Sequence, residues 1–111
     1  MKLAKDLVAA STVPLVLAIL EKGESYGYAI IQRVRDLSKD EIEWTDGMLY
    51  PVLHWLEENG QVHTRWATSD SGRKRKYYFL TPEGRNELAS HKAQWLTVHE
   101  TLRLAWRVKH A

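Results

Sequence analysis

Apolar side chains recur at helical spacing in the first part of the chain, and the first such run follows Ser11 and Thr12. These two residues can cap a helix, and Pro14 is tolerated in a first turn because the backbone N–H groups there have no helical partner. Gly23 then gives a termination signal. The pattern therefore predicts a first helix that ends just before Gly23, with residues 3–10 as a candidate extension of a further turn or two.

Two more helices are predicted from the next apolar runs. Ser25 is a capping residue, and the apolar positions that follow at i, i+4 and i+7 predict an amphipathic helix that ends near Ser38. An acidic linker then leads to Thr45, the next cap, and the third helix stops at Asn59-Gly60. The inner face of this third helix is expected to carry Leu49, Val52, Leu53 and Leu56.

The pattern changes from helical to alternating after the third helix. Residues 61–68, QVHTRWAT, predict a strand, SDSG predicts a turn, and residues 73–81 predict a second strand rich in aromatic side chains. Three aromatic residues are consecutive in that strand, so at least one must face the core. Thr81 then caps a last helix, which begins with a proline and can run to about Lys109.

Three short helices, a two-stranded hairpin and a long helix follow one another in the order of a winged helix-turn-helix, a mainly α fold of the α+β type. We therefore predict a winged helix-turn-helix DNA-binding domain over residues 1–81. Residues 82–111 are predicted to form a C-terminal dimerisation helix packed on the same domain. In this architecture the third helix enters the DNA major groove and the hairpin, or wing, flanks it. Other small domains share this order, so the wing's side chains decide more.

The composition is that of one ordinary globular domain, and it narrows the possible chemistry. The chain has 111 residues, of which 44% are hydrophobic and 27% charged, and a net charge of +2. It has no cysteine, which excludes disulfides, thiolate catalysis and cysteine-ligated zinc and suits the cytoplasm. The apolar run from Val13 to Leu20 is too short for a bilayer and lacks a signal-peptide cleavage pattern. We expect a cytoplasmic protein with no membrane partner.

The positive charge of the chain is concentrated on the predicted wing. Residues 69–78 carry a net charge of +3, although the whole chain carries only +2. The cluster consists of Arg73, Lys74, Arg75 and Lys76. Such a cluster binds phosphates and releases condensed counterions. Strand alternation sends the two arginines to one face and the two lysines to the other. The alternative interpretation is a solvated turn whose charges keep a hairpin edge from aggregating.

The start of the third helix contains residues that weaken helices, which suggests a role other than stability. Gly and Pro in a helix interior cost roughly 1 and about 3 kcal/mol. Gly47 lets a backbone approach DNA closely, and Tyr50 offers a ring to a base and a hydroxyl to a phosphate. The DNA-binding residues predicted on this helix are Thr45, Gly47, Met48, Tyr50, Pro51 and His54. In the alternative interpretation, Tyr50 and His54 are simply exposed.

Three motifs in order resemble the PadR family of bacterial transcriptional regulators: LAILEKGESYGYAIIQRV, GMLYPVLHWLEENGQV and SGRKRKYYFLTPEGR. The resemblance covers about residues 12–88. It implies a winged-helix repressor that is dimeric through its last helix and binds a palindromic operator in double-stranded DNA. Carried over by position, the contacts involve Thr45, Gly47, Tyr50, Pro51, Arg73, Arg75 and Lys76. Met48 stands where the family usually has a threonine. Ser25 and Tyr26, at the start of the second helix, are placed to meet a phosphate.

The last helix carries a seam with spacings of three, four and seven residues, which indicates a partner helix from a second copy of the chain. The predicted dimer residues are Leu88, Lys92, Trp95, His99, Leu102 and Trp106. The alternative is that this helix packs back on its own domain. In some members of the family that the chain resembles, a tryptophan on this helix stacks against planar effectors. Trp95 stands at the matching position, so a small aromatic ligand is a candidate partner; plain packing is the alternative.

No cofactor, metal or catalytic site is predicted. The chain lacks a glycine-rich phosphate loop and a nucleophile motif, which argues against an enzyme. Glu87 and His91 are four residues apart, but one carboxylate and one histidine are too few for zinc unless a dimer completes the site. A winged-helix module that binds proteins instead of DNA remains the main alternative, and the basic wing argues against it. RNA binding is a further alternative, but the hairpin lacks the exposed aromatic platform that single-stranded RNA requires.

Overall fold

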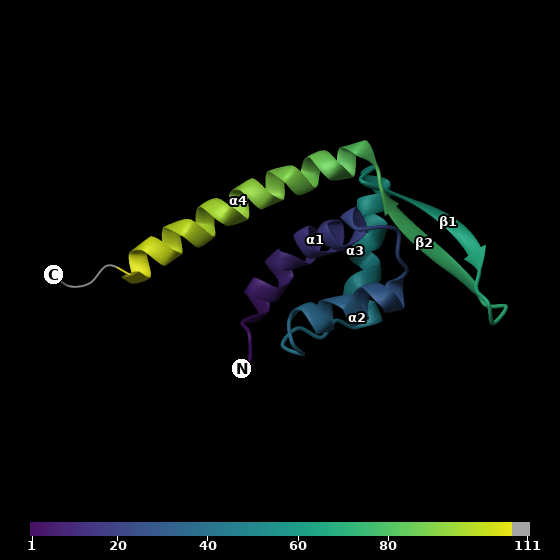
Figure 1. Cartoon of the computed structure of the whole chain (residues 1–111), viewed down its shortest axis with the longest axis horizontal. Helices are drawn as coiled ribbons and strands as arrows, with labels where there is room; N and C mark the ends of the chain where they lie inside the picture. The colour runs from purple at the N-terminus through teal and green to yellow at the C-terminus, as the bar shows by residue number, and fades with distance from the viewer. Residues whose placement is uncertain (108–111) are drawn as a thin grey trace.

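The computed structural model describes residues 1–107, which form four helices and one antiparallel hairpin (Figure 1). The elements are α1 (Lys5–Glu21), α2 (Gly27–Leu37), α3 (Asp46–Glu58), β1 (Val62–Thr68), β2 (Lys74–Leu80) and α4 (Pro82–Arg107). The first three helices pack together, the hairpin projects from one side of them, and α4 extends away on the other side. This is the predicted winged helix-turn-helix with a long C-terminal helix. The predicted end of that helix near Lys109 lies outside the described residues.

The first helix starts earlier than its capping residues suggested. Ala4 is its N-cap, so the prediction that Ser11 and Thr12 cap it is wrong and the candidate extension is confirmed from Lys5 onward. Both hydroxyls instead donate to the Val8 carbonyl, at 2.8 Å for Ser11 and 3.0 Å for Thr12. Hydroxyl side chains can sit inside a helix when they bond the preceding turn in this way.

Ser25 does not cap α2 either. Tyr26 is the N-cap, and Ser25 pairs with Tyr78 through both backbone bonds, N–H to carbonyl at 3.0 Å and the reverse at 2.7 Å. The segment before α2 is therefore a short third partner at the edge of β2. The Thr45 cap of α3 is confirmed, because its Oγ1 accepts the Met48 N–H at 3.3 Å.

The hairpin pairs in the register Val62↔Leu80 to Thr68↔Lys74. Of the three consecutive aromatic residues in β2, Tyr78 faces the core and is 4% exposed, as the pattern required. The remaining core comes from the inner faces of α1, α2 and α3, and Leu49, Leu53 and Leu56 of α3 are fully buried as predicted. Val52 packs at the rim of this core.

Two residues attach α4 to the domain at its first turn. The Thr81 hydroxyl donates to the Gly60 carbonyl at 2.6 Å and accepts the Gly84 N–H at 3.0 Å, so it caps the helix as predicted. Gly84 lies so close to β1 that a methyl group on it would come within 2.1 Å of the Gln61 carbonyl oxygen. The end of the hairpin and the start of α4 are therefore fixed to each other.

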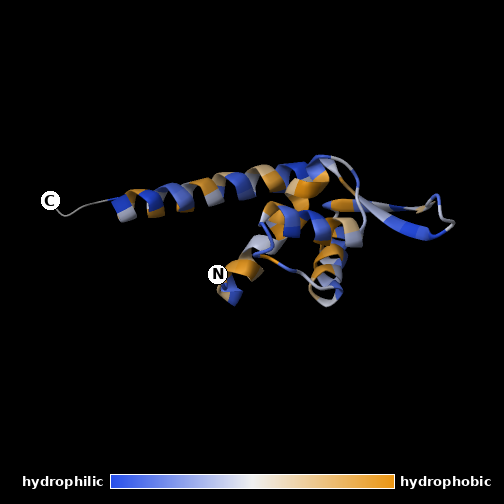
Figure 2. Cartoon of the chain, turned by 60° about the horizontal axis from the view of Figure 1, so that its bottom comes forward, coloured by the Kyte–Doolittle hydropathy of each residue, from blue (hydrophilic) through white to orange (hydrophobic). Residues whose placement is uncertain are grey.

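Only the first part of α4 packs on α1. Leu88 is 1% exposed, and the Lys92 ammonium pairs with Glu21 of α1 at 3.2 Å. Leu88, which the sequence places in a dimer seam, is already buried within one chain and therefore offers almost no surface to a second copy. Beyond Lys92 the helix leaves the domain with apolar positions exposed along it (Figure 2). Across the described residues, no helix combines the length and the apolar character needed to cross a membrane.

Candidate nucleic-acid interface

A groove of about 610 Å³ lies between the N-terminus of α2, the exposed side of α3 and the hairpin. Seven of the predicted DNA-binding residues line it together: Tyr26, Tyr50, His54, Arg73, Lys74, Arg75 and Lys76. The groove also contains Gly27, Tyr28 and Trp66, which the sequence patterns did not single out as binding residues. A basic, aromatic groove of this kind can contact phosphates with its cations and sugars or bases with its rings.

Trp66 is the largest side chain that sequence reasoning missed. It stands opposite Lys76 in the hairpin and is 66% exposed. Thr64 shares its face and bonds to Glu57 of α3 at 3.3 Å, so this face of the hairpin is turned toward α3. Strand alternation identified the face but not its exposure, because α3 covers the base of the hairpin and not its outer part.

Gly27 lets Tyr50 lie against the start of α2. A methyl group at position 27 would come within 2.3 Å of Tyr50 Oη and 2.8 Å of Tyr50 Cζ. The first turn of α2 therefore sets where the Tyr50 ring sits, and the ring remains 45% exposed. The signal available in the sequence was a glycine at the first position of a helix, where helix stability does not favour it.

The first turns of α3 form a separate exposed surface beside the groove. Thr45, Gly47, Met48 and Pro51 are all exposed there, and none of them lines the groove. A methyl group at position 47 would meet only Thr45 Oγ1, at 3.8 Å, within the described chain. The packing of the chain itself therefore does not require a glycine at this position.

One face of the wing is bound to the start of α2 by stacked rings and cations. The Arg75 guanidinium lies 4.3 Å from the centre of the Tyr26 ring, which meets the Tyr77 ring edge-on at 5.5 Å. Arg65 lies over Tyr77 at 5.0 Å and pairs with Glu24. The hydrogen bond from Arg65 holds the pKa of the Glu24 carboxyl below its usual value and raises the pKa of Arg65.

The opposite face of the wing is bound to α3. The Lys76 ammonium lies 3.4 Å from Glu57 Oε1 and 5.6 Å from the centre of the Tyr78 ring. Burial of the Tyr78 hydroxyl raises its pKa. Arg75 and Lys76 thus point to opposite faces, as strand alternation predicted, and each has a partner within the same domain.

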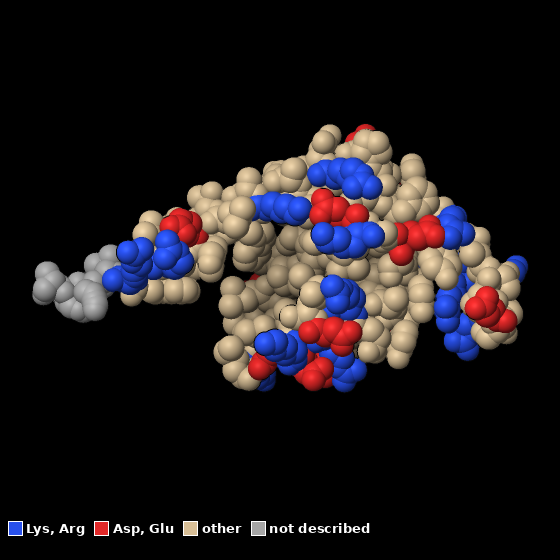
Figure 3. Space-filling model, in the orientation of Figure 1, with Lys and Arg blue, Asp and Glu red and all other residues tan. Residues whose placement is uncertain are grey.

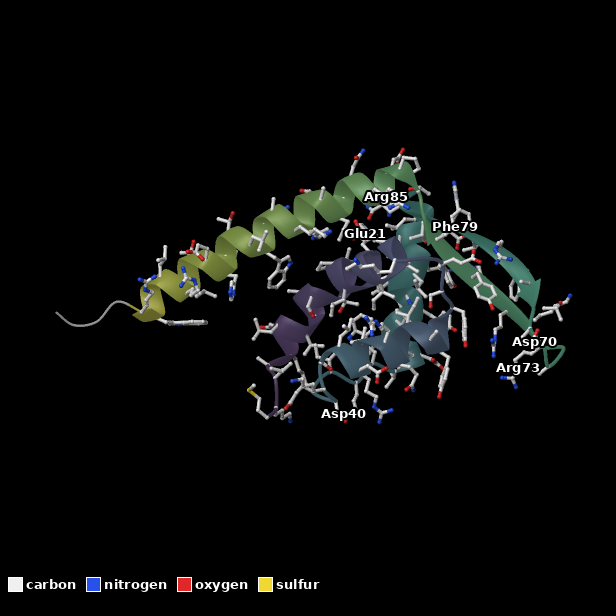
Figure 4. All side chains as sticks on the ribbon, in the orientation of Figure 1. Glu21, Asp40, Asp70, Arg73, Phe79 and Arg85 are labelled. Carbon is white, nitrogen blue, oxygen red and sulfur yellow. The ribbon has the colours of Figure 1, made fainter. Side chains whose placement is uncertain are left out.

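The tip of the wing carries the other two basic residues. These are Arg73 and Lys74, at the end of the turn that joins the two strands. The Arg73 N–H donates to Ser69 Oγ across this turn at 3.2 Å, and Gly72 adopts the positive φ of +83° that the turn requires. Basic side chains gather along the hairpin with Asp70 at its tip, and Arg73 lies beside that tip (Figures 3 and 4). Within residues 1–107, neither Arg73 nor Lys74 forms an ion pair.

The remaining predicted residues lie away from the groove. Ser25 is half-buried, and it lines a different hollow, between α1 and α2. Trp95 is 38% exposed and borders an apolar hollow of about 260 Å³ between α1 and α4, where Pro14 and Ala18 are among the lining residues. In the part of the chain that the structure describes, no group of three or more histidine or acidic side chains is close enough together to hold a metal ion.

Comparisons with known proteins agree with this architecture. A family model described as the transcriptional regulator PadR-like family matches residues 16–90, more than half of the chain. The crystal structure of a PadR family regulator from Eggerthella lenta is 30% identical, with a TM-score of 0.79 over 94% of this chain and 88% of that one. A PadR family regulator from Clostridium difficile is 30% identical, with a TM-score of 0.77 over 86% and 98%. The transcriptional regulator YqjI of Escherichia coli is 27% identical over 80% of this chain and 41% of its own length.

Proposed function

The chain belongs to the PadR-like family of transcriptional regulators, and we propose that it is a homodimer that binds double-stranded DNA sequence-specifically and represses transcription. It is a regulator and not an enzyme. The observation that carries the proposal is the groove between α3 and the wing, because it gathers seven predicted DNA-binding residues from three elements. We propose that the protein acts in the cytoplasm.

The geometry supports a division between reading and anchoring. The exposed start of α3, with Thr45, Gly47 and Met48, is the part that can enter a major groove. Tyr50 and His54 follow on the same helix and line the adjoining groove, where the Tyr50 ring can meet a base and its hydroxyl a phosphate. Cations at the wing tip supply affinity that does not depend on sequence.

The test is DNA binding measured against salt. DNA recovered with the protein from its own genome would identify the operator, and fluorescence anisotropy would compare that duplex with one of mixed sequence. Replacing Arg73 and Lys74 with alanine should weaken binding to both duplexes and lower the salt slope by about 0.9 for each phosphate that is no longer neutralised. Tyr50→Ala and Trp66→Ala should weaken binding as well, and Tyr50→Ala should affect the operator more. Salt-independent binding, or none, would refute the proposal and favour a protein-binding module.

The proposed dimer rests on the exposed part of α4. Trp95, His99, Leu102 and Trp106 continue the helix face on which Leu88 is buried, but α1 covers only the beginning of that face. Trp106 is 74% exposed in the single chain. A second copy, related by two-fold symmetry, would bury this stripe and place two wings on the half-sites of a palindrome. A monomer at micromolar concentration in analytical ultracentrifugation would refute the dimer.

We also propose that a small planar aromatic ligand relieves repression by binding beside Trp95. The supporting observation is the apolar hollow that this side chain borders between α1 and α4. A ligand that binds better when the two copies are spread apart would shift the dimer away from its DNA-binding spacing. Titration with planar aromatic compounds should quench tryptophan fluorescence and release DNA, and Trp95→Ala should remove both effects. A hollow that is filled by the partner's side chains would give neither effect in the parent protein.

A further inference from the structure

The four consecutive basic residues of the wing do not have equivalent surroundings. Lys74 and Arg73 are exposed at the tip, whereas Arg75 and Lys76 are half-buried and contact other elements of the domain. An isolated two-stranded hairpin is at best marginally stable in water. The angle of the wing therefore depends on the contacts that fix the hairpin to the helices.

Beyond the buried packing at the base of the hairpin, the side-chain polar contacts of α3 with the two strands meet, in the described residues, at the Glu57 carboxylate. Glu57 receives both the Lys76 ammonium, at 3.4 Å, and the Thr64 hydroxyl, at 3.3 Å, so it joins α3 to both strands. The side chains of Lys76 and Glu57 are only 30% and 34% exposed. A cation held in this way is directed toward α3 and away from the outer end of the wing.

The contact with α2 is a stack. The Arg75 guanidinium covers the face of Tyr26, the N-cap of α2, and Tyr26 in turn meets Tyr77 of β2. Next to Tyr26, the backbone of Ser25 is bonded to that of Tyr78 on the same strand. The rings and the backbone therefore hold the same segment against β2.

We infer that Arg75 and Lys76 are positioning residues, which hold the wing against α2 and α3 through Tyr26 and Glu57 and leave Arg73 and Lys74 to bind phosphate. This rests on the proposed DNA-binding function. It divides a run of four basic residues, which looks uniform in sequence, into two that orient the wing and two that neutralise the DNA backbone.

Glu57 gives a test in which a positioning role and a purely long-range charge effect predict opposite changes in DNA affinity. Removal of an acidic side chain near DNA strengthens binding if only long-range charge matters. If Glu57 positions the wing, Glu57→Ala should instead weaken binding to a fluorescein-labelled mixed-sequence duplex, by up to about fivefold. Glu58→Ala is the matched control, because Glu58 is the next residue of α3, is exposed, and forms no ion pair within the described residues. Circular dichroism and thermal unfolding check that both variants are folded.

The salt slope separates a positioning lysine from a phosphate ligand. Lys76→Met should weaken binding with little change in the slope, whereas Arg73→Ala and Lys74→Ala should each lower it by about 0.9. The reductions in affinity from Lys76→Met and Glu57→Ala should not add in the double variant, because each removes the same ion pair. A slope that falls for Lys76→Met as it does for Lys74→Ala would overturn the inference for Lys76, and so would tighter binding by Glu57→Ala.

Arg75 is tested by a change that keeps its charge. Arg75→Lys loses the planar group that stacks on Tyr26, so binding should weaken severalfold at an unchanged salt slope. Tyr26→Ala removes the ring and should likewise weaken binding at an unchanged salt slope, and adding Arg75→Lys to it should weaken binding no further, because both changes remove the same stack. Losses of affinity that add in the double variant would show that the two side chains act on DNA independently, and this would overturn the inference.

A readout without DNA distinguishes this inference from the proposed function. The Tyr26 ring should shift the NMR signals of the Arg75 side-chain protons upfield in the free protein, because the guanidinium lies 4.3 Å from the ring centre. The shift should persist in Tyr26→Phe and vanish in Tyr26→Ala. If the parent shows the shift but binds no duplex, the proposed DNA-binding function is refuted and the stack is not. If the shift is absent from the parent, the contact between Arg75 and Tyr26 is refuted, and with it the inference for Arg75.

Discussion

Gly27→Ala should impair DNA binding while leaving the fold almost as stable as before. A methyl group at position 27 would lie 2.3 Å from Tyr50 Oη, and ordinary contact begins at 3.4 Å, so the hydroxyl must move by about 1.1 Å. The atoms in the way are the end of a side chain that is 45% exposed, which can move into the groove. The change therefore displaces one predicted DNA-binding residue without touching the core.

The effect on the free energy of unfolding should be close to zero. Holding the Tyr50 ring away from its preferred rotamer costs about 0.5 to 1.5 kcal/mol. Replacing glycine by alanine at a compatible helical position contributes about 0.4 to 1 kcal/mol in the opposite direction. The effect on binding is larger. A hydroxyl moved by 1.1 Å loses the hydrogen bond that we propose it donates to a phosphate, and about 1.5 kcal/mol of lost binding energy corresponds to roughly tenfold weaker affinity.

Urea unfolding and anisotropy with the operator duplex measure these two quantities. The same glycine-to-alanine change in a Tyr50→Ala background supplies the control, because no ring remains for the methyl group to displace. There, Gly27→Ala should leave the affinity unchanged. Two results would refute the reasoning: a tenfold loss of affinity that persists without Tyr50, or a loss of stability of several kcal/mol in the parent background.

Four further predictions follow from burial and packing. Leu88→Ala should lower the free energy of unfolding by about 2 to 5 kcal/mol in urea titrations, because Leu88 is 1% exposed. Leu102→Ala, at a position 42% exposed in the single chain, should instead weaken self-association in sedimentation experiments. Burial raises the pKa of the Tyr78 hydroxyl above its unfolded value. The contribution of the neutral hydroxyl to stability is therefore complete below the unfolded pKa and is lost as pH rises through the folded pKa. Tyr78→Phe should remove that alkaline loss of stability in urea titrations. Gly47→Ala should be as stable as the parent or slightly more stable, because the added methyl group meets only Thr45 within the described chain. It should bind DNA more weakly in anisotropy, because the methyl group would block the proposed close approach of the backbone to DNA.

These four predictions have clear contrary outcomes. Equal losses of stability in Leu88→Ala and Leu102→Ala would mean that both side chains are buried in the same way. An alkaline transition that is unchanged in Tyr78→Phe would assign the pH dependence to another group. Parent-like DNA affinity in Gly47→Ala would show that no close backbone approach occurs there.

The sequence by itself determined the order of the elements and most of their ends. Helical spacing, the Thr45 and Thr81 caps and the alternation in the hairpin depend on residues within a few positions of one another, so they could be found without tertiary information. The concentration of positive charge on the wing is likewise a property of consecutive residues. The same local logic failed at Ser11, Thr12 and Ser25, because hydroxyl side chains also bond within helices and backbones also pair across a sheet edge.

Tertiary structure decided which side chains are available for binding. Leu88 fits the same seven-residue repeat as Leu102, yet only Leu88 lies where α1 covers it. Lys74 and Lys76 are the same residue type on the same strand, yet only Lys76 reaches the carboxylate of Glu57. Periodicity fixes the direction in which a side chain points from its own element, but the distance to a neighbouring element depends on how the whole chain packs, and that distance determines burial, pairing and access to DNA.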